Sequence, residues 1–98
     1  MNTMKAKICW VLADKGGRKK PPTGPRYSTV ARFPEQGGDW SKQAWSIVAN
    51  FTAPPDEDGC VMAEVGFLSD TAPQHLLKSG ATFELMEGPR VVAKAKIL

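Results

Sequence analysis

Apolar and polar residues alternate along most of this chain with a period of two. In residues 4–12 every second position is apolar, from Met4 to Leu12, and Lys5 and Lys7 stand between them. Such alternation is typical of a β-strand that turns one face to a core. It predicts a first strand at residues 4–12 and further strands at residues 28–33, 44–51, 60–68, 83–86 and 91–97.

Turn signals separate these predicted strands. A Pro-Pro pair followed by Asp-Glu-Asp-Gly at residues 54–59 predicts an acidic turn, and Glu-Gly-Pro-Arg at residues 87–90 joins the last two strands in a hairpin. The only candidate for a helical turn is residues 71–80, which are too few to supply a core. We therefore predict an all-β fold, either a small closed antiparallel barrel of about six strands or a sandwich, as a single domain over residues 1–98.

Charge is divided unevenly between the two parts of the chain. Residues 1–32 contain eight lysines and arginines against one aspartate, whereas residues 33–98 contain five against nine acidic residues. The basic part centres on residues 15–20, Lys-Gly-Gly-Arg-Lys-Lys, where glycines expose backbone amides beside four cations. This combination suits contact with phosphate groups. The alternative is a solvated turn that has no partner.

Other kinds of chemistry have little support in the sequence. Cys9 and Cys60 lie far apart without a C-x-x-C spacing, so we expect two small buried hydrophobic residues instead of a disulfide framework or zinc ligands. His75 is the only histidine and has no neighbouring ligand in the sequence. The acidic turn lacks the spacing of a calcium loop, and the G-x-x-x-x-G-K-[ST] motif is absent. We therefore expect no metal, no cofactor, no nucleotide and no catalysis.

The hydropathy of the chain bears on its location in the cell. The sequence has no run of about 18 apolar residues that could span a membrane. Its N-terminus lacks the basic, apolar and small-residue regions of a signal peptide. We therefore expect a cytoplasmic protein that has no contact with membranes.

Two motifs carry a resemblance to a known family. The first predicted strand leads into Asp14-Lys15-Gly16-Gly17-Arg18, with Gly24-x-Arg26 after a stretch rich in proline and glycine. Far downstream the chain reads Phe83-x-Leu85-x-Glu87-Gly88-x-Arg90-x-Val92-Ala93. In order and spacing these residues resemble the C-terminal domain of translation elongation factor Tu across nearly the whole chain, and most weakly between residues 33 and 51. The resemblance implies a six-stranded antiparallel barrel that stands here without the GTPase and middle domains.

The resemblance also implies contact residues. In the family the barrel contacts the T stem of aminoacyl-tRNA, and Arg18, Glu87 and Gly88 resemble the elements that approach the tRNA backbone. The chain departs from the family pattern where a Lys-Lys pair replaces His-Thr, and where a Tyr-Arg-Pro-Gln-Phe run is reduced to Arg26 and a displaced Tyr27. Together with the local chemistry, this predicts RNA contact by Arg18, Lys19, Lys20, Arg26, Glu87, Gly88 and Arg90.

Two functions are compatible with these features. The first is a non-catalytic module that binds tRNA or another structured RNA by shape, through the basic loop. The second is a protein-protein interaction module that docks on a partner in the translation machinery, as a mimic, decoy or regulator of elongation factor Tu. That module would use Trp40 and neighbouring apolar residues, because Trp40 follows Gly-Gly-Asp in a predicted loop and an exposed tryptophan there would act as an anchor. Trp45 and Phe51 are expected in the core.

Overall fold

The described residues form six strands, in agreement with the predicted all-β fold. The computed structural model describes residues 3–11, 25–34, 45–88 and 90–98. The strands are β1 (Met4–Trp10), β2 (Arg26–Arg32), β3 (Trp45–Phe51), β4 (Cys60–Phe67), β5 (Thr82–Glu87) and β6 (Arg90–Ile97). A short 3₁₀ helix, η3 (Gln74–Leu76), lies between β4 and β5, within the predicted helical turn. In this part of the chain no helix is long and apolar enough to cross a membrane.

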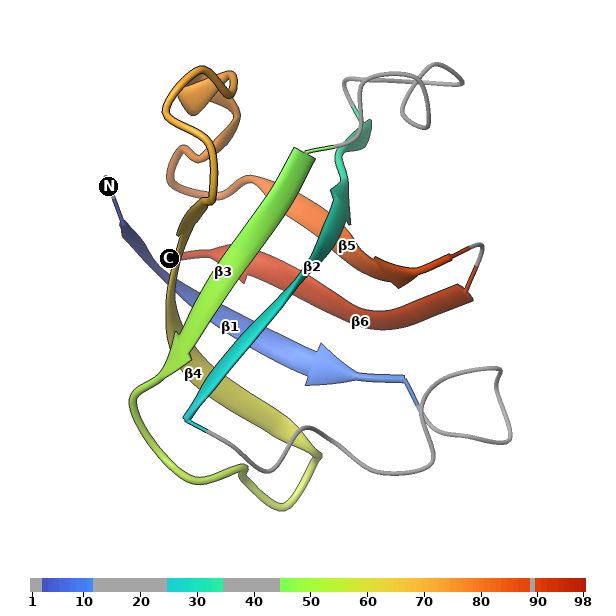
Figure 1. Ribbon diagram of the computed structural model, residues 1–98. Coiled ribbons are helices and arrows are strands. Elements are labelled where there is room, and N and C mark those ends of the chain that lie inside the picture. Colours follow the sequence, from blue (N-terminus) through green and yellow to red (C-terminus); the bar gives the residue numbers. More distant parts are fainter. Residues whose placement is uncertain (1–2, 12–24, 35–44, 89) are drawn as a thin grey trace.

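The six strands close into an antiparallel barrel (Figure 1). Around the barrel the order is β1, β4, β3, β2, β5, β6, and β6 pairs again with β1. Each of the six described strands therefore has a hydrogen-bonded neighbour on both sides, so none of them offers a free edge to another chain. The predicted closed barrel of six strands is confirmed.

The inside of the barrel holds the apolar core that the alternation predicts. On β1, Ala6 and Ile8 are buried while Lys5 and Lys7 are exposed, and the β4 partners of the two buried residues are buried as well. The largest fully buried side chains are Phe67, Phe83, Ile8, Ile47, Leu85, Met86, Ile97, Val48, Val65 and Val92. Among the described residues no polar or charged residue is buried. Apolar burial and backbone hydrogen bonding are therefore what stabilise this core.

Strand β6 departs from strict alternation at Val92. Leu85 pairs with Ala93, whereas Met86 pairs with Val91, so β6 contains one extra residue opposite β5. Such a bulge bends the strand and re-aims its side chains, so that two successive residues can turn to the same side. Val92 and Ala93 are accordingly both fully buried, and the strict alternation predicted for this strand is wrong at this point.

Cys9 and Cys60 form a disulfide between β1 and β4, which corrects the prediction of two separate cysteines. The strands bring these residues, 51 positions apart in the sequence, into direct register. The N–H of Trp10 donates to the carbonyl of Gly59 at 3.2 Å, so the neighbouring pair, Cys9 and Cys60, is a non-hydrogen-bonded pair of the ladder. Partners at such positions approach most closely, here to 4.0 Å between Cα atoms. Disulfides persist mainly in oxidising compartments, so the cytoplasmic location stays a prediction.

Candidate functional site

Four of the predicted RNA-binding residues belong to strand ends, or to the turn that follows one, at one end of the barrel. Because neighbouring strands are antiparallel, β1, β3 and β5 finish at this end, and β2, β4 and β6 begin there. We call it the hairpin end, after the turn between β5 and β6 (Figure 1). The N–H of Val11 donates to the carbonyl of Val92, and the N–H of Phe51 donates to the carbonyl of Pro25, both at 2.9 Å. Val11 and Pro25 are the described residues that flank the basic segment, which comprises residues 12–24. Both are therefore held at the hairpin end by backbone hydrogen bonds.

Four of the seven predicted RNA-binding residues lie at the hairpin end. Arg26 is the first residue of β2, Arg90 is the first residue of β6, and both are exposed. Glu87 pairs with Arg90 in the ladder between β5 and β6, and Gly88 follows Glu87 in the turn. The other three, Arg18, Lys19 and Lys20, lie outside the described residues.

The side chain of Glu87 has a structural partner. Its carboxylate accepts a hydrogen bond from the hydroxyl group of Tyr27, across the boundary between β5 and β2. The backbone ladder between these strands ends at the pair Val30 and Met86, and the hydroxyl of Thr29 donates to the carbonyl of Met86 just beyond it. Beyond the end of the backbone ladder, hydrogen bonds from the side chains of Tyr27 and Thr29 therefore still connect β2 to β5.

Gly88 adopts a backbone conformation that suits glycine. Its φ is 62°, in the left-handed region that an L side chain rarely occupies. A Cβ atom placed there would meet nothing within 4 Å, so the conformation, and not crowding, is what favours glycine. The space beside the Cα atom of Gly88 is therefore open, and a ligand can approach this residue there.

Three aromatic side chains pack together at the hairpin end. The ring of Trp10 meets the ring of Tyr27 edge-on at a centroid distance of 5.6 Å, and that of Phe51 at 6.1 Å. All three are half-buried and lie against the core. Tyr27 therefore belongs both to this cluster and to the hydrogen bond with Glu87. The predicted core position of Phe51 agrees with this packing, whereas the joint role of Trp10 and Tyr27 was not predicted.

The predicted acidic turn lies at the same end, between β3 and β4. The Oδ1 atom of Asp56 accepts hydrogen bonds from the N–H groups of Asp58 and Cys60, each at 2.9 Å. This carboxylate is therefore engaged in holding the turn. Among the described residues no group of three or more His, Cys, Asp or Glu side chains could hold a metal ion.

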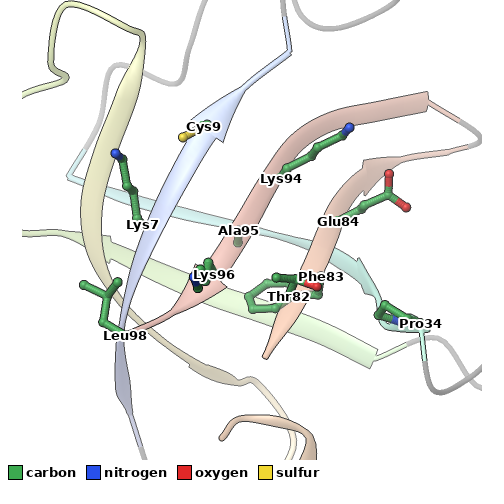
Figure 2. A pocket seen from close by; sticks show the side chains of 10 residues that line it. All are labelled: Lys7, Cys9, Pro34, Thr82, Phe83, Glu84, Lys94, Ala95, Lys96 and Leu98. Carbon is green, nitrogen blue, oxygen red and sulfur yellow. The ribbon is translucent and has the colours of Figure 1, made fainter. Parts of the chain in front are cut away.

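A second polar surface lies on the outer wall of the barrel. Lys7 on β1 pairs directly with Lys96 on β6, and Lys94 stands two residues earlier on β6. All three are exposed and line an open hollow of ≈ 700 Å³, whose lining also includes Cys9 (Figure 2). We call this surface the lysine wall. It was not predicted, because the sequence does not say which strands become neighbours.

Among the described side chains that line this hollow, Glu84 is the one carboxylate, and it already has a cationic partner. The Oε1 atom of Glu84 accepts a hydrogen bond from Nε of Arg32 at 2.8 Å and a second from the terminal nitrogen of the same guanidinium. Glu84 faces Lys94 in the ladder between β5 and β6. Its charge is thus offset by Arg32, and the three lysines leave the lysine wall positively charged.

The chain matches no family model and no curated protein. The likeness to the C-terminal domain of elongation factor Tu therefore rests on the quoted motifs and stays a prediction. The barrel that it implies is present.

The structure does not test the predicted protein contact at Trp40. Trp40 lies outside the described residues, in the segment that joins β2 to β3. The protein-interaction hypothesis therefore stays a prediction. Trp45 is half-buried against the core, close to its predicted place, and His75 is an exposed residue of η3.

Proposed function

We propose that this chain is a non-catalytic module that binds structured RNA at the hairpin end of its barrel. The observation that carries the proposal is the position of Arg26 and Arg90. Both are exposed first residues of strands, at the end where the basic segment of residues 12–24 leaves β1 and returns to β2. A guanidinium group makes paired hydrogen bonds with phosphate oxygens, so exposed arginines suit an RNA backbone.

The proposed contact depends on charge and shape, not on base sequence. The aromatic rings at this end are half-buried against one another, which suits closure of the barrel better than stacking on unpaired bases. The open space at Gly88 leaves room for a phosphate or a ribose near Arg90, which begins the next strand of the same hairpin. Double-stranded RNA is recognised mainly through phosphates and 2′-hydroxyl groups, so a stem such as that of tRNA fits this surface. The motif likeness to elongation factor Tu supports the same class of ligand.

Titration with tRNA at several salt concentrations tests the proposal. The wild-type chain is compared with Arg26→Gln, with Arg90→Gln and with the triple variant Arg18→Glu, Lys19→Glu, Lys20→Glu. Each lost phosphate contact should reduce the slope of log affinity against log salt by about 0.7–0.9. The matched control is Lys78→Gln, because Lys78 is exposed between η3 and β5, at the opposite end of the barrel. Absence of tRNA binding at the lowest salt concentration would reject the proposal.

A further inference from the structure

We propose that the lysine wall is a second phosphate-binding surface, which holds the RNA backbone along the side of the barrel. This inference rests on the proposed function, because it assigns a further footprint to the same ligand. Its residues are Lys7, Lys94 and Lys96, and none of them belongs to the hairpin end. Four observations, on register, charge, shape and continuity, carry it.

The register places like charges directly opposite one another. The N–H of Leu98 donates to the carbonyl of Lys5 at 2.9 Å, and two residues further along the ladder Lys7 pairs with Lys96. Both side chains stand on the outer face, since their sequence neighbours point into the core. Like charges at directly opposed positions destabilise a sheet. A bound anion between the two ammonium groups removes that repulsion, so the pair suits a surface that meets polyanions.

The strands on either side supply no carboxylate opposite this pair. The other cross-strand partner of Lys7 is Met62, and that of Lys96 is Thr82. Glu84 stands opposite Lys94 but is held by Arg32. Within the described part of the chain, none of the three lysine side chains forms an ion pair. Their charges are therefore available to a ligand.

The shape of the surface fits a backbone segment of a polynucleotide. The hollow between β1, β5 and β6 is open and measures ≈ 700 Å³, with the exposed Leu98 at its rim (Figure 2). Lys94 and Lys96 are two residues apart on one strand, which places their Cα atoms roughly 6.6 Å apart. That separation is of the order of the step between successive phosphates along one strand of RNA. Lysine ammonium groups act as flexible point charges, which suits phosphates that need no fixed orientation.

The lysine wall is continuous with the hairpin end through β6. This strand begins with Arg90 at the hairpin end and runs along the wall through Lys94 and Lys96. A single RNA stem that contacts Arg90 can therefore extend along the same strand. This continuity favours RNA over an unrelated acidic protein as the occupant.

Single lysine variants test the inference in the full chain. Lys7→Gln, Lys94→Gln and Lys96→Gln, with Lys78→Gln as the control, are titrated with tRNA. Each of the three should weaken binding roughly five- to eightfold at 0.1 M salt, and Lys78→Gln should not. Circular dichroism should show an intact fold, because replacing Lys7 or Lys96 removes a repulsion.

The outcomes separate this inference from the proposed function. If tRNA binds and none of Lys7→Gln, Lys94→Gln and Lys96→Gln weakens it, the lysine wall is not part of the footprint and the inference is wrong. If the wild-type chain does not bind tRNA, the proposed function itself fails. A second measurement uses the unmodified chain: acetylation of lysines by a soluble reagent, read by mass spectrometry. Bound tRNA should protect Lys7, Lys94 and Lys96, and equal labelling with and without tRNA would also overturn the inference.

Discussion

The hydroxyl group of Tyr27 donates a hydrogen bond to the carboxylate of Glu87, 60 positions away in the chain. The bond joins β2 to β5 beyond the point where their backbone ladder ends. Tyr27 also packs its ring against Trp10, so one side chain ties the aromatic cluster to the β5–β6 hairpin. Glu87 also pairs with Arg90 in the ladder between β5 and β6, so the bond lies next to one of the two exposed arginines.

Tyr27→Phe removes the hydroxyl and keeps the ring. We expect the free energy of unfolding to fall by about 1–2 kcal/mol, because a half-buried hydrogen bond to a carboxylate is lost while the aromatic packing is retained. Urea unfolding measures the change. Ser28→Ala, at the exposed neighbouring position on the same strand, is the control and should stay within about 0.5 kcal/mol of the wild type. Equal stability of Tyr27→Phe and the wild type would show that the bond contributes nothing.

Replacement of both Cys9 and Cys60 by alanine should lower the free energy of unfolding by about 3–4 kcal/mol. The disulfide closes a separation of 51 residues, and cross-linking a loop of that length restricts the unfolded chain strongly. Chemical denaturation under oxidising conditions gives the difference. Dithiothreitol should destabilise the wild type toward the double variant and leave the variant unchanged. A wild type that is insensitive to the reductant would argue against this contribution.

Gly88→Ala should destabilise the barrel by about 1–2 kcal/mol, since φ at this turn is 62° and an L side chain is strained there. The site is open, so no steric clash adds to the cost. Gly88→Asn should cost less, because asparagine tolerates the left-handed region better. Thermal unfolding of the two variants side by side measures this order. If alanine were as stable as glycine, the turn would have to adopt another conformation in solution.

Phe83→Ala tests the centre of the core. Phe83 is fully buried and stacks on Phe33 at a centroid distance of 4.8 Å, and Phe33 in turn contacts Phe67 at 5.7 Å. We expect a loss of about 3–5 kcal/mol, which combines lost apolar burial with the cavity left behind. Leu68→Ala, at a side chain that is 55% exposed, is the matched control and should have little effect. Comparable losses in both variants would contradict the assigned core.

Strands and turns could be predicted because they depend on neighbours in the sequence. The alternation in residues 4–12 predicted that Ala6 and Ile8 point inward and that Lys5 and Lys7 point outward, as observed. The hairpin at residues 87–90 followed from its turn residues in the same way. The bulge at Val92 could not be predicted, since it depends on how β6 fits against β5.

The candidate site was predicted only in part. Arg26, Glu87, Gly88 and Arg90 were chosen from motifs, and the barrel topology brings these four to one end. The lysine wall was missed, although the outward direction of each lysine could be read from the alternation. The sequence did not predict that β1 pairs with β6, the first and last of the six described strands.

The all-β class, the approximate positions of the strands and, apart from the bulge in β6, the side of each strand that faces the core follow from the sequence alone. These properties follow from a period of two and from turn residues, which act over a few positions. Three contacts could be known only from the folded chain: the disulfide between Cys9 and Cys60, the pairing of Lys7 with Lys96, and the hydrogen bond between Tyr27 and Glu87. Each of these contacts joins residues 51 or more positions apart. They depend on strand order and register around the closed barrel, which the packing of all six strands sets together.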